Sequence, residues 1–326
     1  MKNGLLFLFF VTVFLIFPIF GNTQSAEYEI KNSGLTNVGY ATFNLTADGF
    51  NCDGFFEATK NLNDLHIVFL YNTFGNNFSC LGRILNDDRL KTLEINLINE
   101  PGHRNGRLGS YEFLYGVGTV NEFNALMKSR DEKLHKKFSS YVLPLKVFLQ
   151  ENLRPQTTLL INPGLESNLK DVGGKVLVNW ARNEFPEARI VWNPLLPSNR
   201  RRKSAGADLI EGHGPSPKIN SPCVYDMDGT DVSYPNRPAL GQPQHKEGVV
   251  ENWIKSGNPL RAVLEKYANK CEVVFVWTAE SNALNYKSNR FVDPRKRNNN
   301  ISTEMYKTIL KDVEYLHTYG KIYTPQ

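Results

Sequence analysis

Two stretches of the sequence place a glutamate, a serine and an asparagine just after an apolar run. Thr157–Asn162 is followed by a Pro-Gly turn and then Glu166, and Val273–Ala279 leads directly into Glu280. Parallel strands of an α/β fold aim their last side chains into one shared mouth, where ligands and catalytic groups gather. The repeated pattern predicts that Glu166 and Glu280 carry catalysis. The alternative is that each acid lies at a helix N-terminus and complements the helix dipole.

Further acids and amides end other strand-like segments, and together they indicate sugar chemistry. Carboxylates in one pocket raise each other's proton affinity, which separates a protonated acid from ionised bases, as glycosidic cleavage requires. Amides bind sugar hydroxyls and tryptophan faces suit sugar rings, although a strand-end tryptophan is more often a core residue. Glu211 is the third catalytic candidate. The residues expected to bind substrate are Glu100, Asn193, His213, Asp226, Asp228, Trp277 and Asn282.

The elements that must position these residues alternate between strand-like and helix-like segments. Strands are expected at residues 39–45, 66–71, 92–98, 157–162, 189–194, 208–214, 224–229 and 272–278, and helices at 54–62, 80–88, 120–153, 172–185, 247–269 and 302–319. Pro144 should break or kink the third helix. Eight strands, most followed by a helix, predict an α/β fold, a (β/α)8 TIM-type barrel in a single large domain. A doubly wound sheet is the alternative, but no GxGxxG or P-loop run follows any strand.

The N-terminal segment has the features of an export signal. Lys2 precedes the apolar run Leu5–Phe20, and small and polar residues follow it. We therefore predict a signal peptide over residues 1–25, a catalytic domain over residues 26–326, and a secreted or periplasmic protein. An uncleaved membrane anchor is the alternative, which the shortness of the run and Pro18 disfavour.

Charge and composition narrow the range of partners. The chain has 326 residues, 41% of them hydrophobic, enough to bury a large core, and its net charge is +5. The basic clusters at residues 200–203 and 295–297 lie in polar loop sequence without interleaved aromatic residues, so we interpret them as solvated loop charge rather than a site for an acidic polymer. The expected partner is a carbohydrate substrate, with no nucleic acid, no stable membrane partner and no cofactor.

Four cysteines in an exported chain predict two disulfides. Cys52 and Cys80 each follow neighbouring strands, and Cys223 and Cys271 each open neighbouring strands. Adjacent strands lie about 4.8 Å apart, within the Cα range of a disulfide, which favours the pairs Cys52–Cys80 and Cys223–Cys271. No pair has the CxxC or HxxxH spacing of a metal site, so no metal is expected.

Taken together, these features resemble the secreted TIM-barrel glycoside hydrolases. Asn99-Glu100-Pro101 is similar to the Asn-Glu-Pro that carries the acid/base in the retaining, cellulase-like clan of that group. In the clan this motif ends the fourth strand, and a nucleophilic glutamate ends the seventh. Here the motif follows the third predicted strand, and the seventh ends in Asp226. The resemblance therefore implies the fold and the reaction class, but it transfers no catalytic role residue by residue.

Two other functions stay open, as does the stereochemical outcome. His103, Arg104 and His213 with the acids are compatible with a divalent metal site for phosphodiester or ester hydrolysis, which chelation would abolish. A barrel that binds a glycan without cleaving it is also compatible, because barrels host unrelated functions. Glu166 and Glu280 end strands on opposite sides of the barrel, which favours inversion, with carboxyl groups about 6.5–9.5 Å apart. A closer pairing with Glu211 would permit retention, at about 5–5.5 Å.

Overall fold

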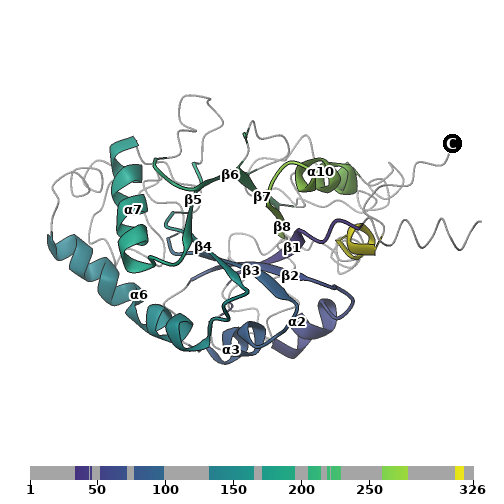
Figure 1. Ribbon diagram of the computed structural model, residues 1–326, viewed down its shortest axis with the longest axis horizontal. Helices are drawn as coiled ribbons and strands as arrows, with labels where there is room; N and C mark the ends of the chain where they lie inside the picture. Colours follow the sequence, from purple (N-terminus) through teal and green to yellow (C-terminus); the bar gives the residue numbers. More distant parts are fainter. Residues whose placement is uncertain are drawn as a thin grey trace, which may run out of the picture.

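The computed structural model describes residues 34–43, 45, 52–71, 77–98, 132–164, 171–194, 205–213, 219–220, 222–228, 259–277 and 313–318. Within this part of the chain, eight parallel strands pair in sequence order and close into a barrel when β1 pairs with β8 (Figure 1). The strands are β1 (Val38–Phe43), β2 (Leu65–Leu70), β3 (Leu90–Asn96), β4 (Thr158–Asn162), β5 (Arg189–Trp192), β6 (Leu209–His213), β7 (Cys223–Asp228) and β8 (Val273–Trp277). The predicted (β/α)8 TIM-type fold is confirmed.

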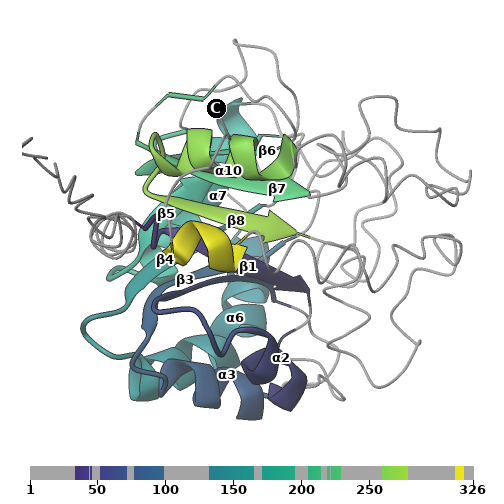
Figure 2. The same cartoon turned by 90° about the vertical axis from the view of Figure 1, so that its right-hand side faces the viewer.

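Helices lie around the outside of the barrel (Figure 1). They are α2 (Cys52–Ala58), α3 (Ser79–Leu85), α6 (Glu132–Asn152), α7 (Asp171–Glu184) and α10 (Pro259–Ala268), with a further helical segment at residues 313–318. Figure 2 shows the strands pointing the same way, so their carboxyl ends share one side of the molecule. None of the helices described is both long and apolar enough to cross a membrane.

Strand side chains alternate between two hydrophobic clusters. Strand residues such as Ile67, Ile161 and Ile190 belong to an outer cluster that also contains Leu81 of α3 and Leu177 of α7. Successive strand residues point to opposite faces, so the inner cluster identifies the positions that face the barrel interior. The inner cluster consists of Val68, Leu160, Val191, Leu209, Val224, Val273 and Phe275.

Two close contacts in the barrel wall depend on glycine. A Cβ at Gly39 of β1 would collide with the backbone of His66 in the neighbouring strand β2. In α7, a Cβ at Gly174 would lie 2.8 Å from the ring of Trp192 on β5. Trp192 directly precedes Asn193, so the tight contact between α7 and β5 positions the strand end that carries this amide.

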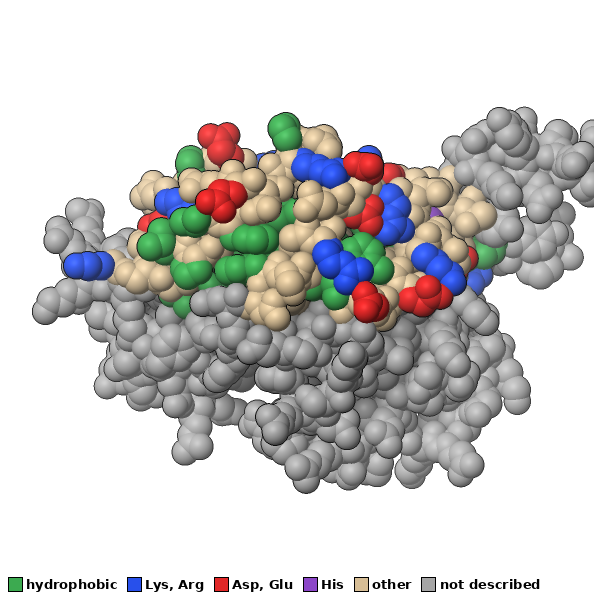
Figure 3. All heavy atoms as spheres, turned by 90° about the horizontal axis from the view of Figure 1, so that it is seen from below, with side chains coloured by type: hydrophobic (Ala, Val, Ile, Leu, Met, Phe, Trp, Pro, Cys, Tyr) green, Lys and Arg blue, Asp and Glu red, His purple; other side chains and the backbone are tan. Residues whose placement is uncertain are grey.

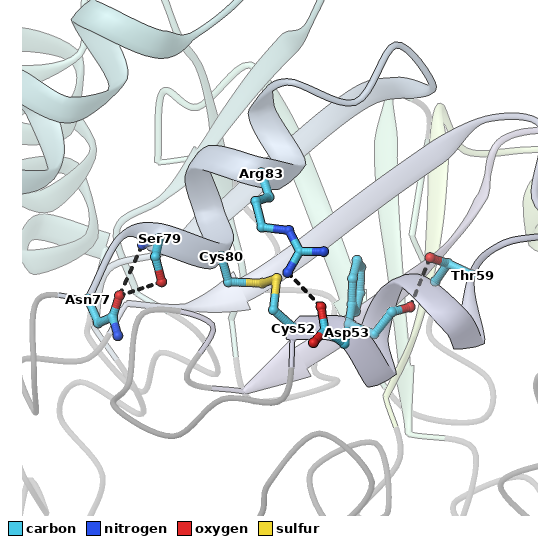
Figure 4. Close-up of a disulfide and its surroundings, with 8 residues drawn as sticks. Cys52, Asp53, Thr59, Asn77, Ser79, Cys80 and Arg83 are labelled. Carbon is cyan, nitrogen blue, oxygen red and sulfur yellow. Dashed lines mark hydrogen bonds and ion pairs between the residues drawn. A yellow bond between two sulfur atoms is a disulfide. The ribbon is translucent and has the colours of Figure 1, made fainter.

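Both predicted disulfides are confirmed. Cys52 of α2 is joined to Cys80 of α3 with a Cα–Cα distance of 5.5 Å, and Cys223 of β7 is joined to Cys271 with a distance of 4.7 Å. Figure 4 shows the first bridge beside the ion pair in which Arg83 donates to Asp53 at 2.8 Å. Disulfides persist in oxidising compartments, so the two bridges fit an extracellular protein.

Of the two alternatives expected at Pro144, a break or a kink, the break is wrong, because α6 continues through this residue from Glu132 to Asn152. Proline leaves the carbonyl of Ser140 without its helical donor. Ser140 is exposed, so water can bind that carbonyl. Tyr141 and Leu145, on either side of the proline, are buried in the outer cluster and hold the helix against the barrel.

The outer surface carries mixed charge. Figure 3 shows Lys and Arg side chains beside Asp and Glu side chains, with hydrophobic side chains among them, on the described part of one face. Lys146 of α6 pairs with Glu184 of α7 at 3.1 Å, which links two helices that are adjacent along the barrel wall. Both side chains are partly buried, so this pair is less screened by solvent than a fully exposed surface pair.

At the amino ends of the strands, two buried histidines form part of the barrel floor. His66 Nδ1 lies 3.0 Å from Thr92 Oγ1, and His317 Nε2 lies 2.5 Å from the carbonyl oxygen of Val38. Burial, helped by the nearby His317, lowers the pKa of His66 to about 4. Burial also lowers the pKa of His317. Both rings are therefore held neutral at neutral pH.

The seam between β1 and β8 is joined by the side chain of Asn37. Its Nδ2 atom donates to the carbonyl oxygens of Ala268 at 2.9 Å and Cys271 at 3.2 Å. The backbone N–H of Val274 donates to the carbonyl of Asn37 at 3.0 Å. One residue thus connects the first strand to the end of α10 and the start of β8.

Several predicted segments lie outside the described residues. These are the signal peptide at residues 1–25, the basic clusters at 200–203 and 295–297, and the parts of predicted helices at 120–131, 247–258, 302–312 and 319. The described remainder of the last two helices is α10 and the helical segment 313–318.

Candidate functional site

A band of buried polar side chains lies inside the barrel toward the carboxyl ends of the strands. Its members come from five consecutive strands or the residue just after one, and each is at most 1% exposed. Polar groups this deeply buried are retained where hydrogen bonds or a function compensate for lost hydration. We call this set the polar band: Glu94, Asn96, Asn162, Asn193, Glu211 and Asp226.

Strand alternation explains why these side chains face inward. Glu94 is in register with Val68 on one side and Leu160 on the other, and both belong to the inner cluster. Asn96 and Asn162 are direct register partners, each two residues beyond this layer. The polar band therefore continues the inner hydrophobic layer toward the mouth of the barrel.

Glu211 is the best-connected acid of the band. Its Oε2 atom accepts hydrogen bonds from Asn162 Nδ2 at 2.5 Å and from Asn193 Nδ2 at 2.7 Å. The register of β5 with β6, in which Trp192 pairs with Ile210, brings Asn193 directly beside Glu211. Two amide donors on one oxygen favour the ionised form of a carboxylate.

Asn162 is held in the orientation that this contact needs. Its Oδ1 atom accepts a hydrogen bond from the backbone N–H of Gly164 at 3.1 Å. The Pro-Gly turn after β4 therefore fixes the oxygen of the amide, and the nitrogen must face the barrel interior. A flipped amide would turn its oxygen toward two carboxyl groups and its nitrogen toward a backbone N–H.

Glu94 approaches the same amide from the other side. Asn162 Nδ2 lies 3.4 Å from Glu94 Oε1. Burial and then the nearby Glu211 carboxylate hold the pKa of Glu94 well above its usual range, and the hydrogen bond from Asn162 opposes this shift. The two acids thus differ in environment: Glu94 favours the neutral form, whereas Glu211 receives two donors.

Three predicted site residues, Asn193, Glu211 and Asp226, belong to the polar band, and the first two contact each other. Asp226 lies on β7, next to the strand that carries Glu211, and is in register with His213 and Phe275. His213, Asp228 and Trp277 are the last residues of β6, β7 and β8, and their side chains lie outside the described part of the structure.

The remaining predicted site residues lie outside the described residues. Among them are both principal catalytic candidates, although the strands that precede these two, β4 and β8, end on the same side of the barrel. These residues are Glu100, Glu166, Glu280 and Asn282, together with His103 and Arg104 of the metal hypothesis.

Three members of the polar band were not predicted as site residues: Glu94, Asn96 and Asn162. Glu94 is a usable signal, because it stands between the apolar residues Leu93 and Ile95 of the strand Leu90–Asn96, and an acid is rarely buried without a partner or a function. A second signal is that an asparagine stands at the carboxyl end of three consecutive strands: Asn96 ends β3, Asn162 ends β4 and Asn193 follows β5.

The two acids of the polar band indicate one kind of chemistry. A neutral acid beside an ionised carboxylate can donate and accept protons. Among the described residues, no three His, Cys, Asp or Glu side chains are placed to hold one metal ion. No protein-family model matches the chain, and no curated protein matches it significantly.

Proposed function

We propose that the protein is a hydrolase that cleaves glycosidic bonds in a carbohydrate or polysaccharide at the carboxyl-end mouth of the barrel. The observation that carries this proposal is the buried pair Glu94 and Glu211, joined through Asn162. Glycosidic hydrolysis needs one neutral and one ionised carboxyl group. The raised pKa of Glu94 supports the first role, and the two amide donors on Glu211 support the second.

The spacing of the pair favours a retaining reaction. Both carboxyl groups approach one nitrogen, so their nearest oxygens are at most about 6 Å apart, closer to the ~5–5.5 Å of retaining enzymes than to the ~6.5–9.5 Å of inverting ones. In this reaction Glu211 bonds to the anomeric carbon while Glu94 protonates the departing oxygen. Water then cleaves the glycosyl-enzyme ester and returns its proton to Glu94.

The strand-following acids complete the proposed site. Glu166 and Glu280 are proposed as acids at the rim, and inversion is the expected outcome if they form the catalytic pair instead. The other sequence-predicted residues are proposed to bind the sugar. Export to a secreted or periplasmic location, supported by the two disulfides, would bring the protein to polysaccharide.

Isosteric substitution tests the proposal on a panel of aryl glycosides and polysaccharides. Glu211→Gln and Glu94→Gln should each lower kcat by at least ~10²-fold, the usual share of a positioned acid or base. Glu272→Gln is the matched control, because Glu272 pairs with Arg189 at the opposite end of the strands. Full activity of both band variants, with losses in Glu166→Gln and Glu280→Gln, would move catalysis to the rim.

The same assay separates the two other functions. Turnover that survives EDTA supports carboxylate chemistry, whereas loss on chelation favours a metal-dependent phosphodiester or ester hydrolase. Binding of a glycan without turnover on any substrate of the panel would identify a non-catalytic barrel and refute the proposal.

A further inference from the structure

Asn96, the last residue of β3, presents a buried amide that no described residue binds. Its side chain is fully buried, and neither Nδ2 nor Oδ1 has a hydrogen-bond partner among the described residues. The backbone of this residue is engaged, because its carbonyl accepts a hydrogen bond from the N–H of Tyr71 at 2.8 Å. The side chain alone is therefore available for a ligand.

Burial of an amide in this way is unfavourable. The register partners of Asn96 are Leu70 and Asn162, and the amide nitrogen of Asn162 is directed to the two glutamates rather than to Asn96. A leucine at this position would lose no described side-chain hydrogen bond and would avoid burying two unpaired polar atoms. A polar residue kept at such a cost indicates a role other than stability.

Two further buried oxygen atoms without a described hydrogen-bond partner lie in the polar band. Glu94 Oε2, two residues earlier on the same inward face, has no partner among the described residues, and neither does Asn193 Oδ1. With Asn96 they provide both donors and acceptors, because the amide supplies each kind in either orientation. A hydroxyl group also donates and accepts, so a polyhydroxyl ligand matches this set.

The charge of the band argues against other ligands. An anion would be repelled by the Glu211 carboxylate, and a metal ion would leave the amide hydrogens of Asn96 without an acceptor. We infer that Asn96, together with Glu94 and Asn193, forms a subsite that binds the hydroxyl groups of a neutral sugar. The inference rests on the proposed function for the nature of the ligand.

Substitution of Asn96 tests the subsite with sugars as probes. Binding of D-glucose, D-galactose, D-mannose, D-xylose and N-acetyl-D-glucosamine is measured by saturation-transfer NMR, and stability by thermal melting. We expect at least one sugar to bind the wild type and Asn96→Leu to weaken that binding at least ~10-fold, while raising the Tm by roughly 2–4 °C.

Thr92→Val is the matched control. Thr92 lies on the same face of the same strand, at its other end, where it contacts His66. This variant should keep wild-type sugar binding while its Tm falls, because the hydrogen bond to His66 is lost. Asn96→Ala is a second variant, which should weaken sugar binding even if the cavity it leaves lowers the Tm.

Several outcomes would overturn the subsite. They are wild-type sugar binding in Asn96→Leu, no binding of any probe to the wild type, or failure of both Asn96 variants to fold. Sugar binding that depends on Asn96 without hydrolysis of any glycan would refute the proposed function and leave the subsite standing. Glycan hydrolysis that is unaffected by Asn96→Leu would refute the subsite and leave the proposed function standing.

Discussion

Glu94 and Glu211 reach one amide nitrogen from β3 and β6, yet their surroundings differ. Glu211 Oε2 lies 2.5 Å from that nitrogen and receives a second donor from Asn193, whereas Glu94 Oε1 lies 3.4 Å away. The fixed amide of Asn162 thus distributes its hydrogen bonding unequally between two acids. Such inequality separates the proton affinities of paired carboxyl groups.

Replacement of Glu94 by glutamine should stabilise the protein and inactivate it. The pKa of Glu94 is raised in the folded state, so the unfolded chain releases this proton at lower pH, and the wild type loses stability as pH rises above about 4.5. Glutamine keeps the shape and the hydrogen bond from Asn162 without the charge. We expect a gain of about 1–3 kcal/mol at pH 8 and little difference at pH 4.

Urea denaturation at the two pH values measures this effect. The Glu272→Gln control, at a half-exposed site paired with Arg189, should not stabilise the protein. A Glu94→Gln variant that is less stable than the wild type at both pH values would show that the carboxyl group is a structural requirement.

Sequence reasoning found Glu211, Asn193 and Asp226 because it searched the carboxyl ends of predicted strands. It missed Glu94 because that residue lies inside a strand, and both faces of a parallel strand are usually buried and apolar, so an acid there was not searched for. Only the register of β3 with β2 and β4 shows that Glu94 faces the interior. Contacts such as that of Asn162 with Glu211 depend on side-chain rotamers and on strands two places apart, which periodicity does not encode.

The strand ends are positioned by how each helix packs on the barrel. In α7, Gly174 lets the helix approach the Trp192 ring of β5, and Trp192 precedes the amide that binds Glu211. The eight strands and the two disulfides were predictable because apolar runs and turn residues recur regularly along the chain. The choice between a break and continuation of α6 at Pro144 was not, because it depends on buried contacts on the other face of the helix.

Addition of one methyl group to α7 should therefore affect both stability and activity. Gly174→Ala places a Cβ 2.8 Å from the Trp192 ring, so the helix or the ring must move, at a cost of about 1–3 kcal/mol. Displacement of β5 should also weaken the contact between Asn193 and Glu211 and lower kcat.

Gly82→Ala in α3 is the matched control. Its Cβ would meet only the end of the Phe148 ring, at 3.3 Å, and the helix gains up to about 1 kcal/mol from the replacement of glycine. Its stability should stay within roughly 1 kcal/mol of the wild type, with normal activity. Equal effects of the two substitutions on thermal melting would contradict the role of the contact between α7 and β5.

Across the barrel as a whole, the two ends respond to pH in opposite directions. The mouth holds an acid with a raised pKa, and the floor holds two histidines with lowered pKa values. The titratable groups that act on His66 there are His317, Asp64 and Lys91. A fall in pH below about 6.5 should therefore destabilise the floor, whereas a rise in pH above about 4.5 should destabilise the mouth.

Stability should fall as pH decreases from about 6.5 to about 4 because of His66. Its pKa is lowered in the folded state, so the unfolded chain binds a proton first, and the folded state loses on the order of 3 kcal/mol across this window. In His66→Asn the free energy of unfolding should change less steeply with pH, because the unfolded chain no longer takes up the one extra proton that His66 binds. Urea titrations at half-unit pH steps measure it, and parallel slopes in the two proteins would contradict the assignment.

The seam joined by Asn37 has a consequence for biosynthesis, because it connects residues that are 231 positions apart. A chain that emerges amino end first exposes β1 long before β8 is available to pair with it. During that interval β1 is an open edge that can pair with other chains. Cys52 and Cys80 are 28 residues apart and can join early, whereas Cys223 must wait until Cys271, 48 residues further along the chain, has been made. The order of synthesis thus makes the pairing of β1 with β8 the last step in closure of the barrel.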